Sequence, residues 1–144
     1  MITGLEVCMV IPSSISALEL YEKIFEVERI EVSDFGVGTS EVVLSIYGSR
    51  IHLLDENAEH MLIAPKAGDP CSSWLNVAVP DINSTFKKAL DNGCQQVVPI
   101  TEMPAMGLKN AMFSDPFGYM WMLHQIDKVV SHEERMKMFQ DQKQ

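Results

Sequence analysis

Glu6 and His52 are the two residues of this 144-residue sequence best suited to acid–base chemistry. Each lies in a stretch that alternates apolar and polar residues, as a β-strand with one covered face does. A carboxylate that faces an imidazole can move a proton or orient a polar ligand near neutral pH. We therefore take Glu6 and His52 as candidate catalytic residues, with a hydrogen-bonded pair of structural role as the alternative.

A methionine-rich strand is expected after the turn at 115–118. Alternation places Met120 and Met122 on one face of this strand. Trp121 and Leu123 share the other face, which suits burial beneath a helix. Methionine adapts to ligands of varied shape, so the first face can line a pocket for an aromatic or amphipathic molecule. The alternative is a plain hydrophobic core filled by the same side chains.

Arg50 favours a ligand site, because a buried guanidinium needs a carboxylate or an anionic ligand group as its partner. Glu6 and Glu41 are the carboxylates expected to be near enough for this role. His124 is expected at the solvent-exposed end of its strand. The residues that we expect to line the cavity and bind the ligand are Cys8, Arg50, Trp74, Asn76, Phe113, Met120 and Met122.

The helices and strands that position these residues occur twice along the chain in the same order. Asp81 is a good helix N-cap and Gly93 a good helix terminator, and the spacing of Ser131 and Glu134 predicts a capping box that starts a short C-terminal helix. Periodicity and turn residues predict strand 3–11, helix 14–25, strand 27–35, two strands within 40–56, strand 73–80, helix 81–93, strand 94–103 and two strands within 104–126.

The two halves of the chain repeat one βαβββ unit. A spacing of 68 residues relates Ile11 to Val79, and a spacing of 70 relates Gly48 to Gly118. Repeated units bury their hydrophobic faces against each other. The expected fold is α+β, with two paired βαβββ modules forming a curved eight-stranded mixed sheet around a cavity and the helices outside. We expect a single domain with module one at 1–56, a linker at 57–72, module two at 73–127 and a C-terminal tail at 128–144.

The composition limits the partners. A net charge of −9 disfavours nucleic acid and anionic membrane surfaces, which both need a basic footprint. No stretch approaches the roughly 20 apolar residues of a membrane span, and the first residues lack the features of a secretory signal, so a cytoplasmic location is expected. Cys8, Cys71 and Cys94 have no metal or redox spacing and are expected to be reduced and mostly buried.

Four stretches carry a resemblance to a known family: "ALELYEKIF" (17–25), "GSRIHLLDE" (48–56), "VPDINSTFKKALDNG" (79–93) and "FSDPFGYMWMLHQ" (113–125). In this order they resemble the vicinal oxygen chelate superfamily of glyoxalases, bleomycin-resistance proteins and dioxygenases, and in particular its PhnB-like branch. The resemblance implies paired βαβββ modules and a homodimer.

Metal-dependent members of that superfamily hold their ion at four strand positions, which correspond here to Glu6, His52, Trp74 and Met122. An indole offers no lone pair to a metal, and a thioether prefers soft ions. The usual four-ligand metal site is therefore expected to be absent.

Three functions are compatible with these features. The favoured one is a binding protein that holds a small aromatic or amphipathic molecule between the modules, without a metal or other cofactor. The alternative is an enzyme, a metal-dependent or acid–base lyase, isomerase or dioxygenase that uses Glu6 and His52, with a divalent metal as cofactor. The third is an interaction module that acts through its dimer interface. The expected partners are a small-molecule ligand and a second copy of the chain, with no nucleic acid and no membrane.

Overall fold

The computed structural model describes residues 3–143, which form the predicted βαβββ unit twice. The elements of the first unit are β1 (Val7–Ile11), α1 (Ser14–Ile24), β2 (Val27–Ser33), β3 (Glu41–Ile46) and β4 (Ser49–Asp55). The elements of the second are β5 (Leu75–Ala78), α2 (Ile82–Asp91), β6 (Gln95–Met103), β7 (Leu108–Ser114) and β8 (Met120–Ile126). The remaining elements are the 3-10 turns Ala58–His60 and Pro104–Met106 and the C-terminal helix α3 (His132–Gln142). The predicted order of elements is confirmed.

Each unit forms its own four-stranded mixed sheet. Sheet one has the strand order β1-β4-β3-β2, and sheet two has the equivalent order β5-β8-β7-β6. The first strand of each unit pairs in parallel with the last, and the other neighbours are antiparallel. Within residues 3–143 no strand pairing joins the two sheets. The α+β class and the paired modules are confirmed, with the eight strands divided into two sheets.

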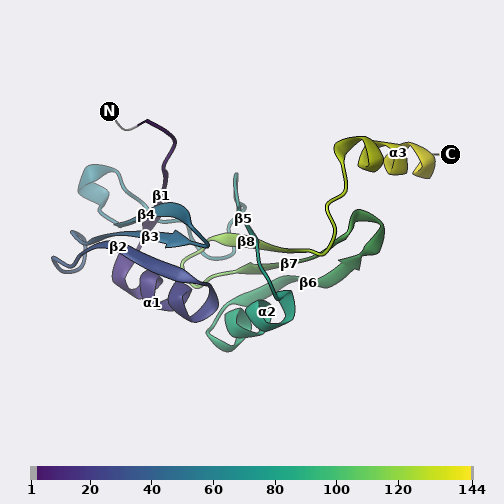
Figure 1. The fold of residues 1–144 in the computed structure, drawn as a ribbon. Helices are drawn as coiled ribbons and strands as arrows, with labels where there is room; N and C mark the ends of the chain where they lie inside the picture. Colours follow the sequence, from purple (N-terminus) through teal and green to yellow (C-terminus); the bar gives the residue numbers. More distant parts are fainter. Residues whose placement is uncertain (1–2, 144) are drawn as a thin grey trace.

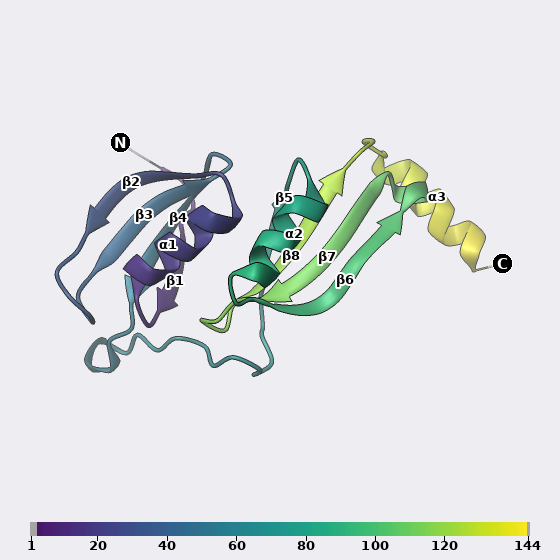
Figure 2. The ribbon, with the colours of Figure 1, turned by 90° about the horizontal axis from the view of Figure 1, so that it is seen from below.

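Helices α1 and α2 lie on the same side of the two sheets (Figure 1). The view from below shows α1 over sheet one and α2 over sheet two, with α3 beyond the far end of sheet two (Figure 2). We call the opposite, helix-free side of each sheet its open face. No helix among the described residues has the length and apolarity needed to span a membrane.

Local sequence accounts for the ends of the helices. The Ser13 hydroxyl and the Asp81 carboxylate accept hydrogen bonds from backbone N–H groups in the first turns of α1 and α2. Ser131 and Glu134 form the predicted capping box at the start of α3. Gly48 lies in the two-residue turn between β3 and β4 with φ of 84°, a conformation that favours glycine.

Aromatic side chains from both units form the centre of the hydrophobic core. Tyr21 and Phe25, from the end of α1, lie with ring centroids 5.1 Å and 5.2 Å from Trp121 of β8. Phe113 of β7 stacks on Trp121 at 6.3 Å. All four side chains are buried. The helix of the first unit therefore packs against the sheet of the second, and one core holds both units together.

Asp115 is a buried hydrogen-bond acceptor at the junction of the units. Its Oδ2 accepts from the hydroxyl of Tyr21 at 2.7 Å and from Nε1 of Trp121 at 2.8 Å. Its Oδ1 accepts from the backbone N–H groups of Phe117 and Tyr119 at 3.0 Å and 2.9 Å. Burial raises the pKa of Asp115, and these four donors oppose that rise because they favour the ionised carboxylate.

We expect Asp115→Ala to lower the free energy of unfolding by about 2–5 kcal/mol, because it leaves two buried side-chain donors without an acceptor, each at a cost of about 1–3 kcal/mol. Tyr21→Phe removes a single donor and should cost less. Asp91→Ala, at an exposed ion pair with Lys87, should change stability by about 0.5 kcal/mol or less. Urea unfolding measures all three. A smaller loss for Asp115→Ala than for Tyr21→Phe would contradict this account.

Candidate functional site

The open face of sheet one brings together four of the residues predicted from the sequence. Strands β1 and β4 pair in parallel with Cys8 opposite His52. Glu6 precedes Cys8 by two residues and Arg50 precedes His52 by two, so alternation directs all four side chains to the same face. The contacts within this group confirm the predicted proximity of Glu6 to both Arg50 and His52.

Glu6 is the centre of this group. Its Oε1 lies 3.0 Å from Nδ1 of His52, and its Oε2 accepts a hydrogen bond of 2.8 Å from Nε of Arg50. The thiol of Cys8 donates a long hydrogen bond of 3.9 Å to Oε1. The hydrogen bond with His52, followed by that with Arg50, lowers the pKa of Glu6. Arg50 has its predicted carboxylate partner, but its side chain is 54% exposed rather than buried.

His52 lies between two carboxylates. While Nδ1 faces Glu6, Nε2 lies 3.5 Å from Oε2 of Glu41 on β3, too far for a good hydrogen bond. This Nε2 atom is buried and has no hydrogen-bond partner among the described residues. An imidazole between two carboxylates can pass or hold a proton, so the geometry agrees with the acid–base chemistry expected from the residue types.

The open face of sheet two has a different character. Trp74 is 56% exposed just before β5, and Met120 and Met122 are half-buried on β8. Asn76 and His124 add a polar pair on the same face, with 3.4 Å between Nδ2 and Nδ1. Burial lowers the pKa of His124. This face therefore offers an apolar surface with two polar groups at its β5 edge.

Two expectations from the sequence are wrong in detail. Phe113 was expected in the ligand lining, but it pairs with Trp121 across β7 and β8, faces the helices and is fully buried in the core. Cysteines were expected to be mostly buried, but only Cys94 is. Cys8 is exposed because it lies on the open face of an edge strand, and Cys71 is exposed in the linker before β5.

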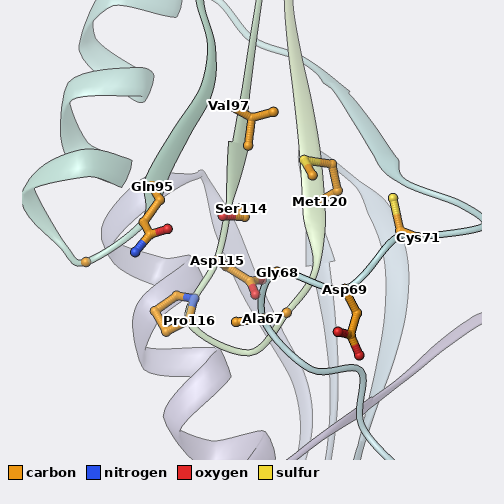
Figure 3. A pocket seen from close by; sticks show the side chains of 12 residues that line it. Ala67, Gly68, Asp69, Cys71, Gln95, Val97, Ser114, Asp115, Pro116 and Met120 are labelled. Carbon is orange, nitrogen blue, oxygen red and sulfur yellow. The ribbon is translucent and has the colours of Figure 1, made fainter.

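Two adjoining hollows lie between the linker and the start of β8. Their volumes are about 290 Å³ and 360 Å³, and both are lined by Asp69, Cys71, Gly118 and Met120. Figure 3 shows Met120 on its strand and Cys71 on the linker segment next to it, among the side chains that line the first hollow. Met120 is the one residue of the predicted lining that borders these two hollows.

The sequence did not point to the linker residues that line these hollows, because the composition of the linker is typical of a flexible connection. The informative feature was its length, since connections of more than about 12–15 residues without regular structure are uncommon in compact domains and often form binding loops. Gly118 shows that the linker is closely packed. A Cβ at this position would lie 2.8 Å from the carbonyl oxygen of Pro65, so the turn before β8 can approach the linker only with glycine there.

A sequence profile of the Glyoxalase/Bleomycin resistance protein/Dioxygenase superfamily matches residues 7–123. The chain belongs to this superfamily. The matched span runs from the start of β1 into β8 and so covers both βαβββ units. A search of curated proteins finds no significant match.

Solved structures of the same superfamily share the fold. FosX from Listeria monocytogenes, solved with Mn(II) and sulfate, is 16% identical with a TM-score of 0.67, over 96% of this chain and 99% of FosX. TioX from Micromonospora sp. ML1 is 18% identical with a TM-score of 0.64, over 86% and 98% of the two chains. The PhnB protein from Bacillus cereus is 17% identical with a TM-score of 0.64, over 85% and 99%. At these identities the similarity establishes the fold alone.

The superfamily includes metal-dependent members, so the four corresponding positions can be tested against a divalent ion. Glu6 and His52 offer a carboxylate oxygen and an imidazole nitrogen 3.0 Å apart. Trp74 offers no lone pair, and the thioether of Met122 is a poor ligand for hard and borderline ions. This set of four residues does not fit such an ion.

The thiol of Cys8 should react slowly with iodoacetamide near pH 8. Desolvation and the charge of Glu6 raise its pKa, so little of the reactive thiolate forms. Replacing Glu6 by glutamine removes that charge, and we expect alkylation of Cys8 to accelerate by several-fold.

Mass spectrometry of the alkylated peptides separates the three cysteines. Exposed Cys71 serves as the internal control and should react at the same rate in both proteins. Cys94, whose pKa burial raises to about 12, should stay unmodified in the folded protein. Equal acceleration at Cys8 and Cys71 would show that Glu6 acts on the whole fold and not on its neighbour.

Proposed function

We propose that the protein binds a small aromatic or amphipathic molecule on the open face of sheet two, without the four-residue metal site of its metal-dependent relatives. The observation that carries this proposal is the pair of hollows of about 290 Å³ and 360 Å³ that share Met120 as a lining residue. Cavities for small ligands begin at about 300 Å³ and combine an apolar lining with a few polar groups.

The open face of sheet two, which Met120 shares with the hollows, offers both an apolar surface and polar groups. Met120 and Met122 are adaptable apolar side chains, and the exposed indole of Trp74 offers a flat surface for an aromatic ring. Asn76 and His124 supply hydrogen-bonding groups on the same face. A ligand with one apolar ring and one polar substituent suits this distribution.

The polar group on sheet one extends the proposed binding surface. Both open faces lie on the side of the molecule away from α1 and α2 (Figure 1). Arg50 keeps more than half of its side chain exposed although it is paired with Glu6, so its remaining guanidinium N–H groups can meet an anionic substituent. Cys8 is the other polar residue of the expected lining on sheet one.

The two tryptophans provide a direct test. Trp74 is 56% exposed and directly follows Ser73, which lines the second hollow, whereas Trp121 is fully buried in the core. A panel of aromatic and amphipathic compounds, first screened by thermal shift, should contain members that change the tryptophan emission on binding. Trp74→Phe should remove this change, because the remaining indole of Trp121 lies beyond the reach of a bound ligand.

Substitutions on and away from the proposed binding surface test where the ligand binds. Met122→Ala should weaken binding by about 5–30-fold, the loss expected when about 1–2 kcal/mol of apolar contact is removed. Met136→Ala, on the exposed side of α3, is the matched control and should bind as the unmodified chain does. A compound that binds equally well to the Met122→Ala and Trp74→Phe proteins would contradict the proposed location.

We also propose that the protein is a homodimer. Large apolar side chains are exposed on the isolated chain, which a second copy can cover. Among those within strands and helices, the most exposed are Ile126, Phe139 and Val97. Light scattering of the protein at micromolar concentration should give twice the chain mass of 16.2 kDa. A mass equal to that of one chain would contradict the proposal.

A further inference from the structure

Three potential metal ligands converge on the open face of sheet one. The carboxylate of Glu6, the thiol of Cys8 and the imidazole of His52 place their donor atoms within 4.8 Å of one another. We propose that these three side chains form a zinc site, which combines Glu6 and His52, two of the four superfamily positions, with Cys8, which is not one of them. The proposal goes beyond the binding of an organic molecule on sheet two.

The pairing of β1 with β4 creates the cluster. In the parallel register Cys8 lies directly opposite His52, so their side chains point to the same face. Glu6, two residues before Cys8, shares that face because strand side chains alternate. Strand β1 is at the edge of sheet one, so an ion can reach the three ligands from solvent.

The donor separations suit a tetrahedral zinc ion. Zinc bonds of about 2.0–2.3 Å at tetrahedral angles place neighbouring donors about 3.3–3.6 Å apart. Oε1 of Glu6 lies 3.0 Å from Nδ1 of His52 and 3.9 Å from Sγ of Cys8. All three donor atoms lie within 4.8 Å of one another, so the side chains must move closer together to bind one ion. Water can take the fourth position.

Neighbouring groups orient two of the ligands. Arg50 binds Oε2 of Glu6, so that Oε1 is the oxygen that faces the other two ligands, His52 and Cys8. Nε2 of His52, which has no hydrogen-bond partner, lies 3.5 Å from the carboxylate of Glu41. When Nδ1 binds a metal, Nε2 carries the proton, and a closer approach of Glu41 would let it donate a hydrogen bond to this carboxylate, as metal-bound histidine commonly does.

The thiolate decides which metal the site prefers. A sulfur, nitrogen and oxygen set suits zinc, whereas magnesium, calcium and manganese prefer oxygen ligands. The thiol of Cys8 must lose its proton to solvent as the zinc–sulfur bond forms, and no oxidation or reduction takes place. Zinc binding should therefore release a proton and weaken as the pH falls.

Zinc titration against a chromophoric chelator at pH 7.5 tests the proposal on the full chain. We expect one ion per chain, with the affinity lowered at least 10-fold by Cys8→Ser and by His52→Gln. Glu41→Gln should weaken binding by about 10-fold, the usual effect of losing a carboxylate that orients a metal-bound histidine. Cys71→Ser replaces another exposed thiol and is the matched control, with unchanged affinity.

Cobalt substitution gives a spectroscopic test of the sulfur ligand. The Co(II) protein should show a thiolate-to-metal charge-transfer band that is lost in Cys8→Ser and kept in Cys71→Ser. Circular dichroism checks that the variants are folded, which we expect because Cys8 and Cys71 are exposed. Failure to bind zinc, or zinc binding unaffected by Cys8→Ser, would overturn the proposal.

Thiol protection separates this proposal from the proposed function. In the absence of an organic ligand, bound zinc should protect Cys8, but not Cys71, from alkylation. Loss of this protection with retained changes in Trp74 emission would overturn the zinc site and leave the binding site on sheet two intact. Protection of Cys8 by zinc without any ligand-induced change in Trp74 emission would support the zinc site and overturn the binding site on sheet two.

Discussion

The buried carboxylate of Asp115 is the interaction on which the arrangement of the two units depends. Its four hydrogen bonds connect the turn before β8, the indole of Trp121 and the hydroxyl of Tyr21 on α1. A carboxylate in a hydrophobic core is stable only when its acceptor capacity is satisfied. This requirement gives the α1–β8 contact a specific geometry, which apolar packing alone would leave less well defined. The shared core then places both helices on one side of the molecule.

The exposure of the two open faces follows from that arrangement. Because both helices cover the same side, side chains that alternate away from the core remain accessible on β1, β4 and β8. The two faces differ in chemistry although the units share one topology. Sheet one presents the charged group around Glu6, and sheet two presents Met120, Met122 and Trp74. A repeated scaffold thus offers two surfaces for ligands of different character.

The change of residue types explains how this chain departs from metal-dependent members of its superfamily. At two of the four positions that the resemblance assigns to metal ligands, Trp74 and Met122 have side chains that suit an organic ligand better than a hard or borderline ion. Cys8 adds a donor beside Glu6 and His52 that the four-position scheme does not include. In our proposals, metal binding is therefore confined to one sheet and apolar binding to the other.

The sequence by itself determined the order of the elements and the direction of most side chains. Periodicity, the caps at Asp81 and Ser131 and the two-fold repeat rest on local preferences, and alternation along β8 predicted the buried faces of Trp121 and Leu123. Only the tertiary structure decided the strand register, which sets Cys8 opposite His52 and turns Phe113 into the core. It also decided how the linker packs against Gly118 to form the hollows. These features depend on contacts between residues far apart in the chain, which local propensity does not encode.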